Sequence, residues 1–161
     1  AALGHRRIAR VAGTSSFRHT SSRSAEFRAS AARLGLGDLI VQADFTSQDS
    51  ARATRTLLSL PERPTAILYD SDVMALAGLG VAAEMGVDVP GELSIVSWDD
   101  SQLCRLVHPA LTALSRDVAG YGARVARTLL GLVGGSPPAA YEADPYFLTA
   151  RASSAPPRPS R

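Results

Sequence analysis

Four aspartates follow two apolar runs that are typical of buried strands. Asp70 and Asp72 come after "TAILY", and Asp99 and Asp100 come after "LSIVSW". In a parallel sheet the carboxyl ends of the strands meet at one edge, where ligands bind, so we expect these carboxylates to lie close together. Clustered carboxylates suit a hard cation such as Mg²⁺. An ionised carboxylate also accepts strong hydrogen bonds from ligand hydroxyls.

The four aspartates need not share one role. Asp72 stands directly before a helical pattern, so we expect it to cap that helix by accepting free backbone N–H groups. Asp99 is the stronger candidate for binding ligand hydroxyls. A metal-dependent phosphoryl enzyme of this layout usually needs a nearby lysine, and this chain contains none. The metal interpretation is therefore the weaker one.

Two further residues, Arg23 and Phe45, could contact a ligand at the same edge. Arg23 falls in the first turn of a predicted helix, where its guanidinium can bind two hydroxyls or a carboxylate. Phe45 follows a predicted strand and could stack on a sugar or base ring. The chain is rich in arginine, so a solvated Arg23 and an ordinarily packed Phe45 remain open alternatives.

Other site types find no support in the sequence. His5, His19 and His108 lack metal-ligand spacing, and no glycine-rich phosphate loop is present. Cys104 is the single cysteine, which excludes an internal disulfide. We therefore predict no catalytic residue, no metal and no cofactor.

The composition indicates a folded chain in the cytoplasm. Its 161 residues are 45% hydrophobic and 20% charged, as expected for one ordinary domain. The net charge of +2 is too small to indicate nucleic-acid binding. No apolar stretch approaches the roughly 20 residues that cross a bilayer, so we expect no membrane partner.

Strand and helix patterns alternate along the chain. This alternation predicts an α/β fold with three layers, a parallel sheet carrying helices on both faces. The Pro-rich tail 153–161 is expected to be disordered. Strands are predicted at 6–13, 39–45, 64–72, 93–98 and 146–151, and helices at 20–35, 47–60, 72–86 and 118–135. Helix 20–35 is expected to bury Ala25, Phe27, Ala31 and Leu34, and Ser47 is the expected cap of the second helix.

A resemblance to a known family extends these inferences. The segments "HRRIARVAG", "RSAEF", "ADF", "RPTAILYDSDVMALAGL", "VPGELSIVSWDD" and "PALTAL" occur in this order. Together they resemble the effector-binding region of LacI/GalR-family transcriptional regulators, from Gly4 to about Ser154. The block from "PTAILY" to "PALTAL" is the most specific part.

The resemblance implies a periplasmic-binding-protein-like (type I) fold. In that family two α/β subdomains flank a ligand cleft, and the chain crosses between them three times. Residues 1–116 would form the core of the C-terminal subdomain, 117–140 would match the last helix of the N-terminal subdomain, and 141–152 would return as a strand. The DNA-binding domain and most of the N-terminal subdomain are expected to precede Ala1 and to be absent here.

The resemblance also assigns site residues. Arg23 matches the arginine that contacts the effector, although Glu26 replaces the glycine usual in that motif. Phe45 matches an aromatic residue that stacks on the effector ring, and Asp99 matches an acid that accepts effector hydrogen bonds.

Further expected ligand contacts lie in neighbouring loops. Ser71 stands where sugar-binding members often carry Asn, with Asp72 beside it. Phe17 and His19 fall in a loop where family members set specificity. Arg116 stands at a crossover between subdomains, where Gln is common.

The family dimerises through this subdomain, so a homodimer is expected. Leu76, Leu79 and Val107 are the predicted interface residues, with ordinary core packing as the alternative.

These observations favour an effector-sensing part of a LacI-like regulator, not an enzyme. Its predicted partners are a small sugar-like or nucleoside-like molecule, a second copy of the chain and, through the missing N-terminal domain alone, operator DNA. Two alternatives stay open: a solute-binding protein of the same fold, and a metal-dependent flavodoxin-like enzyme that uses the aspartates.

Overall fold

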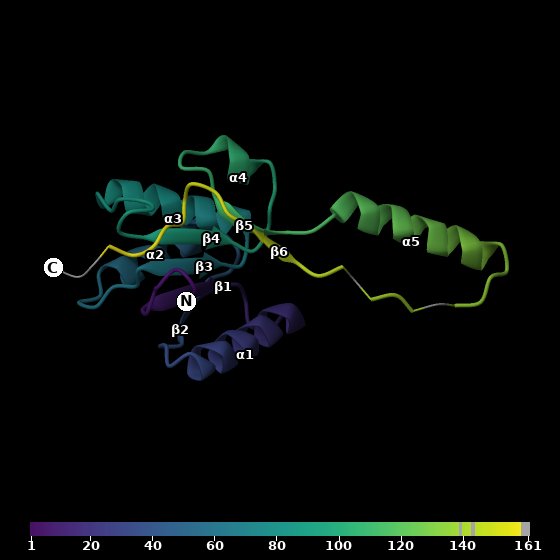
Figure 1. Cartoon of the computed structure of the whole chain (residues 1–161), viewed down its shortest axis with the longest axis horizontal. Helices are drawn as coiled ribbons and strands as arrows, with labels where there is room; N and C mark the ends of the chain where they lie inside the picture. Colours follow the sequence, from purple (N-terminus) through teal and green to yellow (C-terminus); the bar gives the residue numbers. More distant parts are fainter. Residues whose placement is uncertain (139, 143, 159–161) are drawn as a thin grey trace.

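A six-stranded sheet forms the centre of the molecule (Figure 1). The structure is a computed structural model that describes residues 1–138, 140–142 and 144–158. The strands lie in the order β2-β1-β3-β4-β5-β6; all pairs are parallel except β5 with β6. The strands are β1 (Ile8–Ala12), β2 (Leu39–Gln42), β3 (Ala66–Tyr69), β4 (Ser94–Ser97), β5 (Thr112–Ser115) and β6 (Phe147–Thr149).

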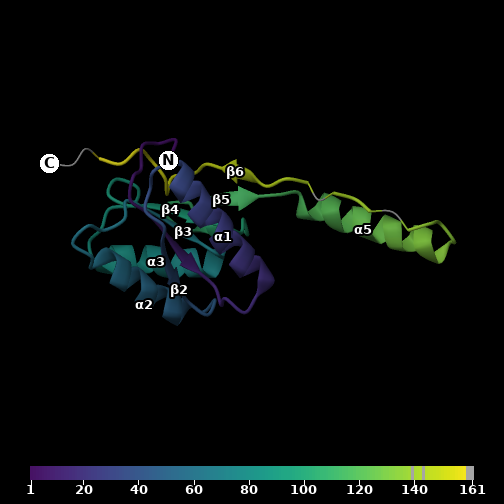
Figure 2. The same cartoon turned by 90° about the horizontal axis from the view of Figure 1, so that it is seen from below.

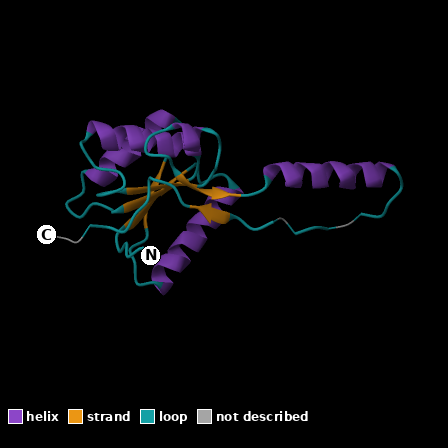
Figure 3. Cartoon of the chain, turned by 45° about the horizontal axis from the view of Figure 1, so that its top comes forward, coloured by secondary structure: helices purple, strands orange, loops and turns teal. Residues whose placement is uncertain are grey.

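Helices cover both faces of this sheet. Figures 1 and 3 show α2 and α3 on one face and α1 on the other. The predicted three-layer α/β fold is thereby confirmed. The helices are α1 (Arg18–Arg33), α2 (Ser47–Leu58), α3 (Asp72–Glu84), the short α4 (Leu103–Leu106) and α5 (Val118–Val133).

The main hydrophobic core lies between the sheet and helices α2 and α3. Leu57 of α2, Ile67 of β3 and Met74 of α3 are completely buried in it. Tyr69 reaches so far under α3 that a Cβ on Gly78 would stand 2.1 Å from its hydroxyl oxygen. Only glycine permits that approach, which packs β3 and α3 tightly together.

A buried ion pair connects the sheet to α1 on the opposite face. The Arg10 guanidinium donates to both carboxylate oxygens of Asp70, at 2.9 and 2.7 Å, and both side chains are fully buried. Arg10 also donates to the Ser24 hydroxyl of α1 at 2.9 Å, and Asp70 accepts the Gly13 backbone N–H at 3.0 Å. Asp70 is thus occupied by protein donors, which weakens the alternative of a cation site built from the four aspartates.

This ion pair also changes which face of α1 is buried. The predicted buried face was wrong at Ala25, which is exposed, and at Leu34, which is 53% exposed. Ser24 is buried instead, because its hydroxyl serves the Arg10 guanidinium. Apolar periodicity could not predict a face that is organised by a buried charge.

Two helix caps lie one residue before their predicted positions. Thr46, not Ser47, caps α2 by accepting a backbone N–H at 3.2 Å. Ser71 is the N-cap of α3 and accepts a backbone N–H at 3.3 Å, and Asp72, one residue later, accepts the Val73 N–H at 2.7 Å, as expected of it. Asp72 lies in the first turn of α3, where its negative charge interacts favourably with the positive end of the helix dipole.

The sequence patterns indicated no element between residues 98 and 118, but α4 and β5 both lie there. Each is four residues long, which is too short for a periodic signal.

Helix α5 extends away from the sheet, and the chain returns from its far end to β6 (Figure 2). No residue of α5 is buried, and Leu129, Leu130 and Val133 are among its exposed apolar side chains. The assignment of 117–140 to a separate subdomain remains a prediction.

The beginning of the C-terminal tail is part of the folded body. Ser153 is fully buried; its hydroxyl donates to the Ile95 carbonyl at 2.6 Å and accepts the Thr112 N–H at 2.8 Å, which joins β4 to β5. His5 also bonds the Ala155 carbonyl at 2.9 Å, and burial lowers the pKa of His5. These buried polar groups place residues 153–155 in the folded body, against the expected disorder of this part of the tail, and the disorder expected for the rest of the tail remains a prediction. Residues 159–161 lie outside the described residues.

In the described part of the chain, no helix has the length and apolar character that a bilayer crossing requires.

Removing one partner of the buried ion pair should cost much more stability than removing both. Arg10→Leu leaves the Asp70 carboxylate buried without its countercharge, so we expect a loss of about 3–5 kcal/mol in the free energy of unfolding. Arg10→Leu with Asp70→Asn should recover much of that loss, because the amide still accepts the Gly13 N–H. Urea unfolding followed by Trp98 emission measures all three proteins. A double variant that is no more stable than Arg10→Leu would contradict the pairing.

Candidate ligand-binding site

The carboxyl ends of β1, β2, β3 and β4 meet at one edge of the sheet, as parallel topology requires. The segments that follow these strands, which include the start of α1, carry the predicted ligand contacts. Phe17 and His19 follow β1, Phe45 follows β2, Ser71 follows β3, and Asp99 follows β4. Chain segments far apart in sequence therefore supply side chains to one surface.

Three of the predicted residues form an aromatic cluster at this edge. The rings of Phe17 and His19 stack with centroids 5.5 Å apart, and each lies 6.0 Å from the Phe45 ring. Phe17 is 51% exposed, so the cluster offers an aromatic surface to solvent. The structure thus brings these three side chains together, and their contact with a ligand remains a prediction.

Phe45 adopts a backbone conformation that a bulky residue rarely takes. Its φ is 68°, in the left-handed region that costs a residue with a Cβ free energy. The neighbouring Asp44 carboxylate accepts the Thr46 N–H at 2.9 Å, and hydrogen bonds from Thr46 lower the pKa of Asp44. On its other side the ring covers Gly13, where a Cβ would stand 1.9 Å from it. Surrounding contacts thus fix the strained Phe45 in one position.

Arg23 reaches from α1 to the end of β4. Its guanidinium carbon lies 4.0 Å from the centroid of the Trp98 ring, within the range of a cation–π contact. Burial lowers the pKa of Arg23, and the Asp70 and Asp99 charges oppose that shift. The sequence did not predict a site role for Trp98, although its place directly before Asp99 is a signal that could have found it.

Asp99 and its neighbour Asp100 have different environments. The carbonyl of Asp99 accepts the Ser97 hydroxyl at 2.7 Å, while the residue itself remains exposed. Desolvation raises the pKa of Asp99, the Arg23 and Arg116 charges lower it, and Asp72 raises it further. A carboxylate that is accessible and flanked by two cations is suited to accept hydrogen bonds from a ligand.

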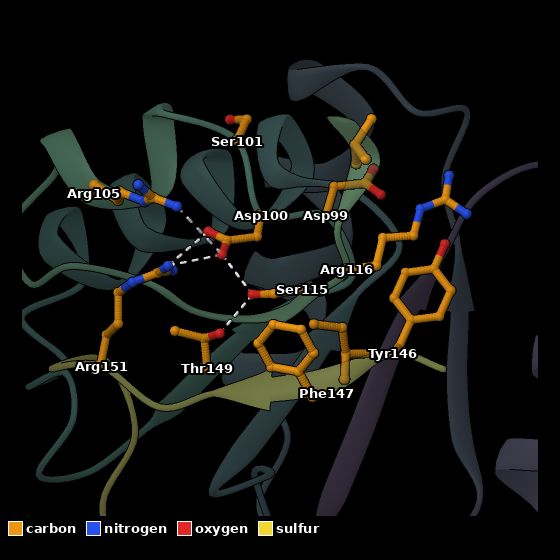
Figure 4. Close-up of a pocket in the computed structure, with 12 residues that line it drawn as sticks. Asp99, Asp100, Ser101, Arg105, Ser115, Arg116, Tyr146, Phe147, Thr149 and Arg151 are labelled. Carbon is orange, nitrogen blue, oxygen red and sulfur yellow. Dashed lines mark hydrogen bonds and ion pairs between the residues drawn. The ribbon is translucent and has the colours of Figure 1, made fainter. Parts of the chain in front are cut away.

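Asp100 is bound by protein side chains instead. Its carboxylate accepts from Arg151 at 2.8 Å and from the Ser115 hydroxyl at 2.5 Å (Figure 4). The hydrogen bond from Arg151 lowers the pKa of Asp100 and outweighs the effect of burial. Asp99 and Asp100 both line a cavity of about 530 Å³ between the ends of β4, β5 and β6.

The arrangement argues against the metal-dependent alternative. Asp70 and Asp100 both bind arginines, which removes two of the four predicted carboxylates from a cation site. Across the ranges that the structure describes, no three His, Cys, Asp or Glu side chains are grouped to hold a metal ion.

The other residues predicted to contact a ligand or a second subunit make contacts within the chain. Ser71 caps α3, and the Asp72 carboxylate accepts the adjacent Val73 N–H at 2.7 Å; their ligand contacts remain predictions. Leu76, Leu79 and Val107 are half-buried against the main core. Their role in a dimer interface also remains a prediction.

Known protein families and structures match this chain over nearly its whole length. The periplasmic binding protein-like domain family matches residues 1–154. The HTH-type transcriptional repressor CytR of Escherichia coli K12 is 34% identical over 116 residues, which is 70% of this chain and 34% of CytR.

Solved structures show the same similarity. A LacI family transcriptional regulator from Bifidobacterium animalis subsp. lactis superposes with a TM-score of 0.92 at 45% identity, over 97% of this chain and 58% of that one. The dimeric Lac repressor with an 11-residue C-terminal deletion superposes with a TM-score of 0.90 at 27% identity, over 98% of this chain and 58% of that chain. The chain therefore spans about a third of CytR and less than two thirds of these two structures.

Gly13 should be essential for the position of Phe45. In Gly13→Ala the new Cβ collides with the ring, so we expect a loss of about 1–3 kcal/mol in the free energy of unfolding. In a Phe45→Ala background the same substitution should cost little, since the ring is gone. Urea unfolding of the four proteins gives this double-mutant cycle. An equal cost in both backgrounds would show that Gly13 does not support Phe45.

Proposed function

The chain belongs to the periplasmic binding protein-like domain family, as the effector-binding region of a LacI-family transcriptional regulator, and we propose that its exposed sheet edge binds a small, neutral, polar ligand. The observation that carries the proposal is that Arg23 on α1, Phe45 after β2 and Asp99 after β4 all follow strands whose carboxyl ends share one edge of the sheet. Phe45 offers an aromatic face, Arg23 offers hydrogen-bond donors, and Asp99 offers acceptors. A ligand with one ring and several hydroxyls would use all three.

The balance of charge supports a neutral ligand. Two cations, Arg23 and Arg116, and two anions, Asp99 and Asp72, act on one another at this edge. The fifth charge, Asp70, is neutralised by Arg10. Charges of both signs therefore lie at this edge, and the hydroxyls of a neutral ligand can bond to both, donating to Asp99 and accepting from Arg23.

A sugar and a nucleoside-like molecule both fit this description. Both present hydroxyls to charged side chains and a ring face to an aromatic residue. Apolar ring faces gain from contact with Phe45 and its neighbours Phe17 and His19, and the vicinal hydroxyls of either class suit the planar Arg23 guanidinium.

In the full-length regulator, ligand binding would alter DNA affinity. Such coupling is reciprocal and is typically worth about 1–3 kcal/mol. The protein would act as a homodimer, as the name of the dimeric Lac repressor indicates for that relative. Leu76, Leu79 and Val107 are the proposed interface residues, and operator DNA would be bound by a domain outside residues 1–161.

The test is a titration of this chain with sugars, polyols, nucleosides and purines. Trp98 is the single tryptophan, and its contact with Arg23 makes its emission sensitive to a ligand at this edge. We expect a saturable change with at least one sugar or nucleoside, and the ligand should be recovered chemically intact. Recovery of an altered ligand would indicate an enzyme instead.

Matched variants identify the contacts. Asp99→Asn and Arg23→Met should each weaken binding by about 10- to 100-fold, as expected when a charged hydrogen bond is lost. Asp38→Asn removes a carboxylate that is exposed elsewhere on the surface and should leave affinity unchanged. Because the pKa of Asp99 is raised, affinity should fall on acidification as this carboxylate protonates, and Asp99→Asn should abolish that dependence. Unchanged affinity in both site variants would refute the assignment.

A further inference from the structure

Two arginines and three aromatic rings form a continuous row of contacts from the ligand edge to α5. The Arg23 guanidinium lies 4.0 Å from the Trp98 ring centroid, and Trp98 meets Tyr146 edge-on at 5.9 Å. The Arg116 guanidinium lies between two tyrosines, 5.2 Å from the Tyr146 centroid and 5.4 Å from the Tyr121 centroid. We call this row, Arg23–Trp98–Tyr146–Arg116–Tyr121, the cation–aromatic ladder.

The middle of the ladder lies where α5 joins the body. Arg116 directly follows β5, and Tyr146 directly precedes β6, so each sits on one of the two connections between the sheet and α5. Figure 4 shows the Arg116 and Tyr146 side chains next to each other at this place. Tyr121 lies in the first turn of α5. The ladder therefore spans both connections and ends on the helix.

The inner end of the ladder lies in the proposed ligand site. Trp98 is the residue before Asp99, and its ring lies between Arg23 on one side and Tyr146 on another. The buried indole Nε1–H has no hydrogen-bond partner among the described residues. The Trp98 ring is therefore not held through this N–H group, and its contacts with Arg23 and Tyr146 contribute to its orientation.

We propose that Trp98, Tyr146 and Arg116 are positioning residues that tie Arg23 to α5. Through this row, the orientation of Arg23 at the ligand edge and the orientation of α5 depend on each other. The consequence for ligand sensing rests on the proposed function. A ligand that moves Arg23 would change the stacking of Arg23 on Trp98 and, through Tyr146 and Arg116, the orientation of α5. The tie itself can be measured without any ligand.

The competing explanation is that these are independent surface contacts. Arg116 is exposed, and Tyr121 and Tyr146 are about two-fifths exposed, where single cation–π contacts are weak. Independent contacts would transmit nothing, so a change at Tyr121 would leave Trp98 unaffected. If the ladder ties Arg23 to α5, a change at Tyr121 should alter the environment of Trp98.

The first experiment follows the single Trp98 indole N–H resonance by NMR in the ligand-free chain. Tyr121→Leu and Arg116→Gln should each shift this resonance, although Tyr121 makes no direct contact in the ladder with Trp98. Arg127→Gln removes the same charge from an exposed position on α5 and should leave it in place. An unshifted indole resonance in both ladder variants would overturn the proposal.

The second experiment measures residual dipolar couplings of the backbone amides. In the unmodified chain, α5 should share the alignment of the sheet. In Arg116→Gln the couplings of α5 should shrink while those of the sheet, which report folding, stay the same; Arg127→Gln should resemble the unmodified chain. Unchanged α5 couplings in Arg116→Gln would overturn the tie. Because neither experiment uses a ligand, failure here leaves the proposed ligand site standing, and failure of the ligand titration leaves the tie standing.

Discussion

The buried ion pair between Arg10 and Asp70 is the constraint on which the ligand edge depends. Burying two charges is costly unless both are fully hydrogen-bonded. Here the requirement is met by two bonds within the pair, one to the Ser24 hydroxyl and one from the Gly13 N–H. The cost of burial therefore forces the end of β1, the end of β3 and helix α1 into one arrangement.

The site follows from that arrangement. Gly13 is held at the end of β1, and Phe45 covers it in a strained conformation. Helix α1 is held through Ser24, one residue from Arg23, which reaches Trp98 at the end of β4. The acidic residues of this edge are divided between two tasks. Asp70 and Asp100 bind arginines and fix the framework, while Asp99 remains exposed to accept hydrogen bonds from a ligand.

The sequence was sufficient for the elements that have a strong periodic or apolar signal. The apolar runs that form β3 and β4 predict strands, since burial of a continuous apolar segment dominates their free energy. The long amphipathic pattern predicts α5, although none of its residues is buried. It also predicted that Arg23, Phe45 and Asp99 lie at one edge, because the segments that follow parallel strands start from the same end of the sheet; their role in ligand binding remains a proposal. Asp70 and Asp99 look alike in sequence, however, since each follows an apolar strand. Only the distant Arg10, itself within an apolar run, separates their roles. Ser153 was misassigned for the same reason, because its partners Ile95 and Thr112 are remote in sequence.

A crystal structure of this chain with the sugar or nucleoside that changes Trp98 emission tests the account most directly. The account predicts a ligand whose ring lies against Phe45 and whose hydroxyls bond to Asp99 and Arg23, with the Arg10–Asp70 pair intact beneath it. A ligand bound instead at Asp70 or Asp100, or in a cavity along α5, would contradict it.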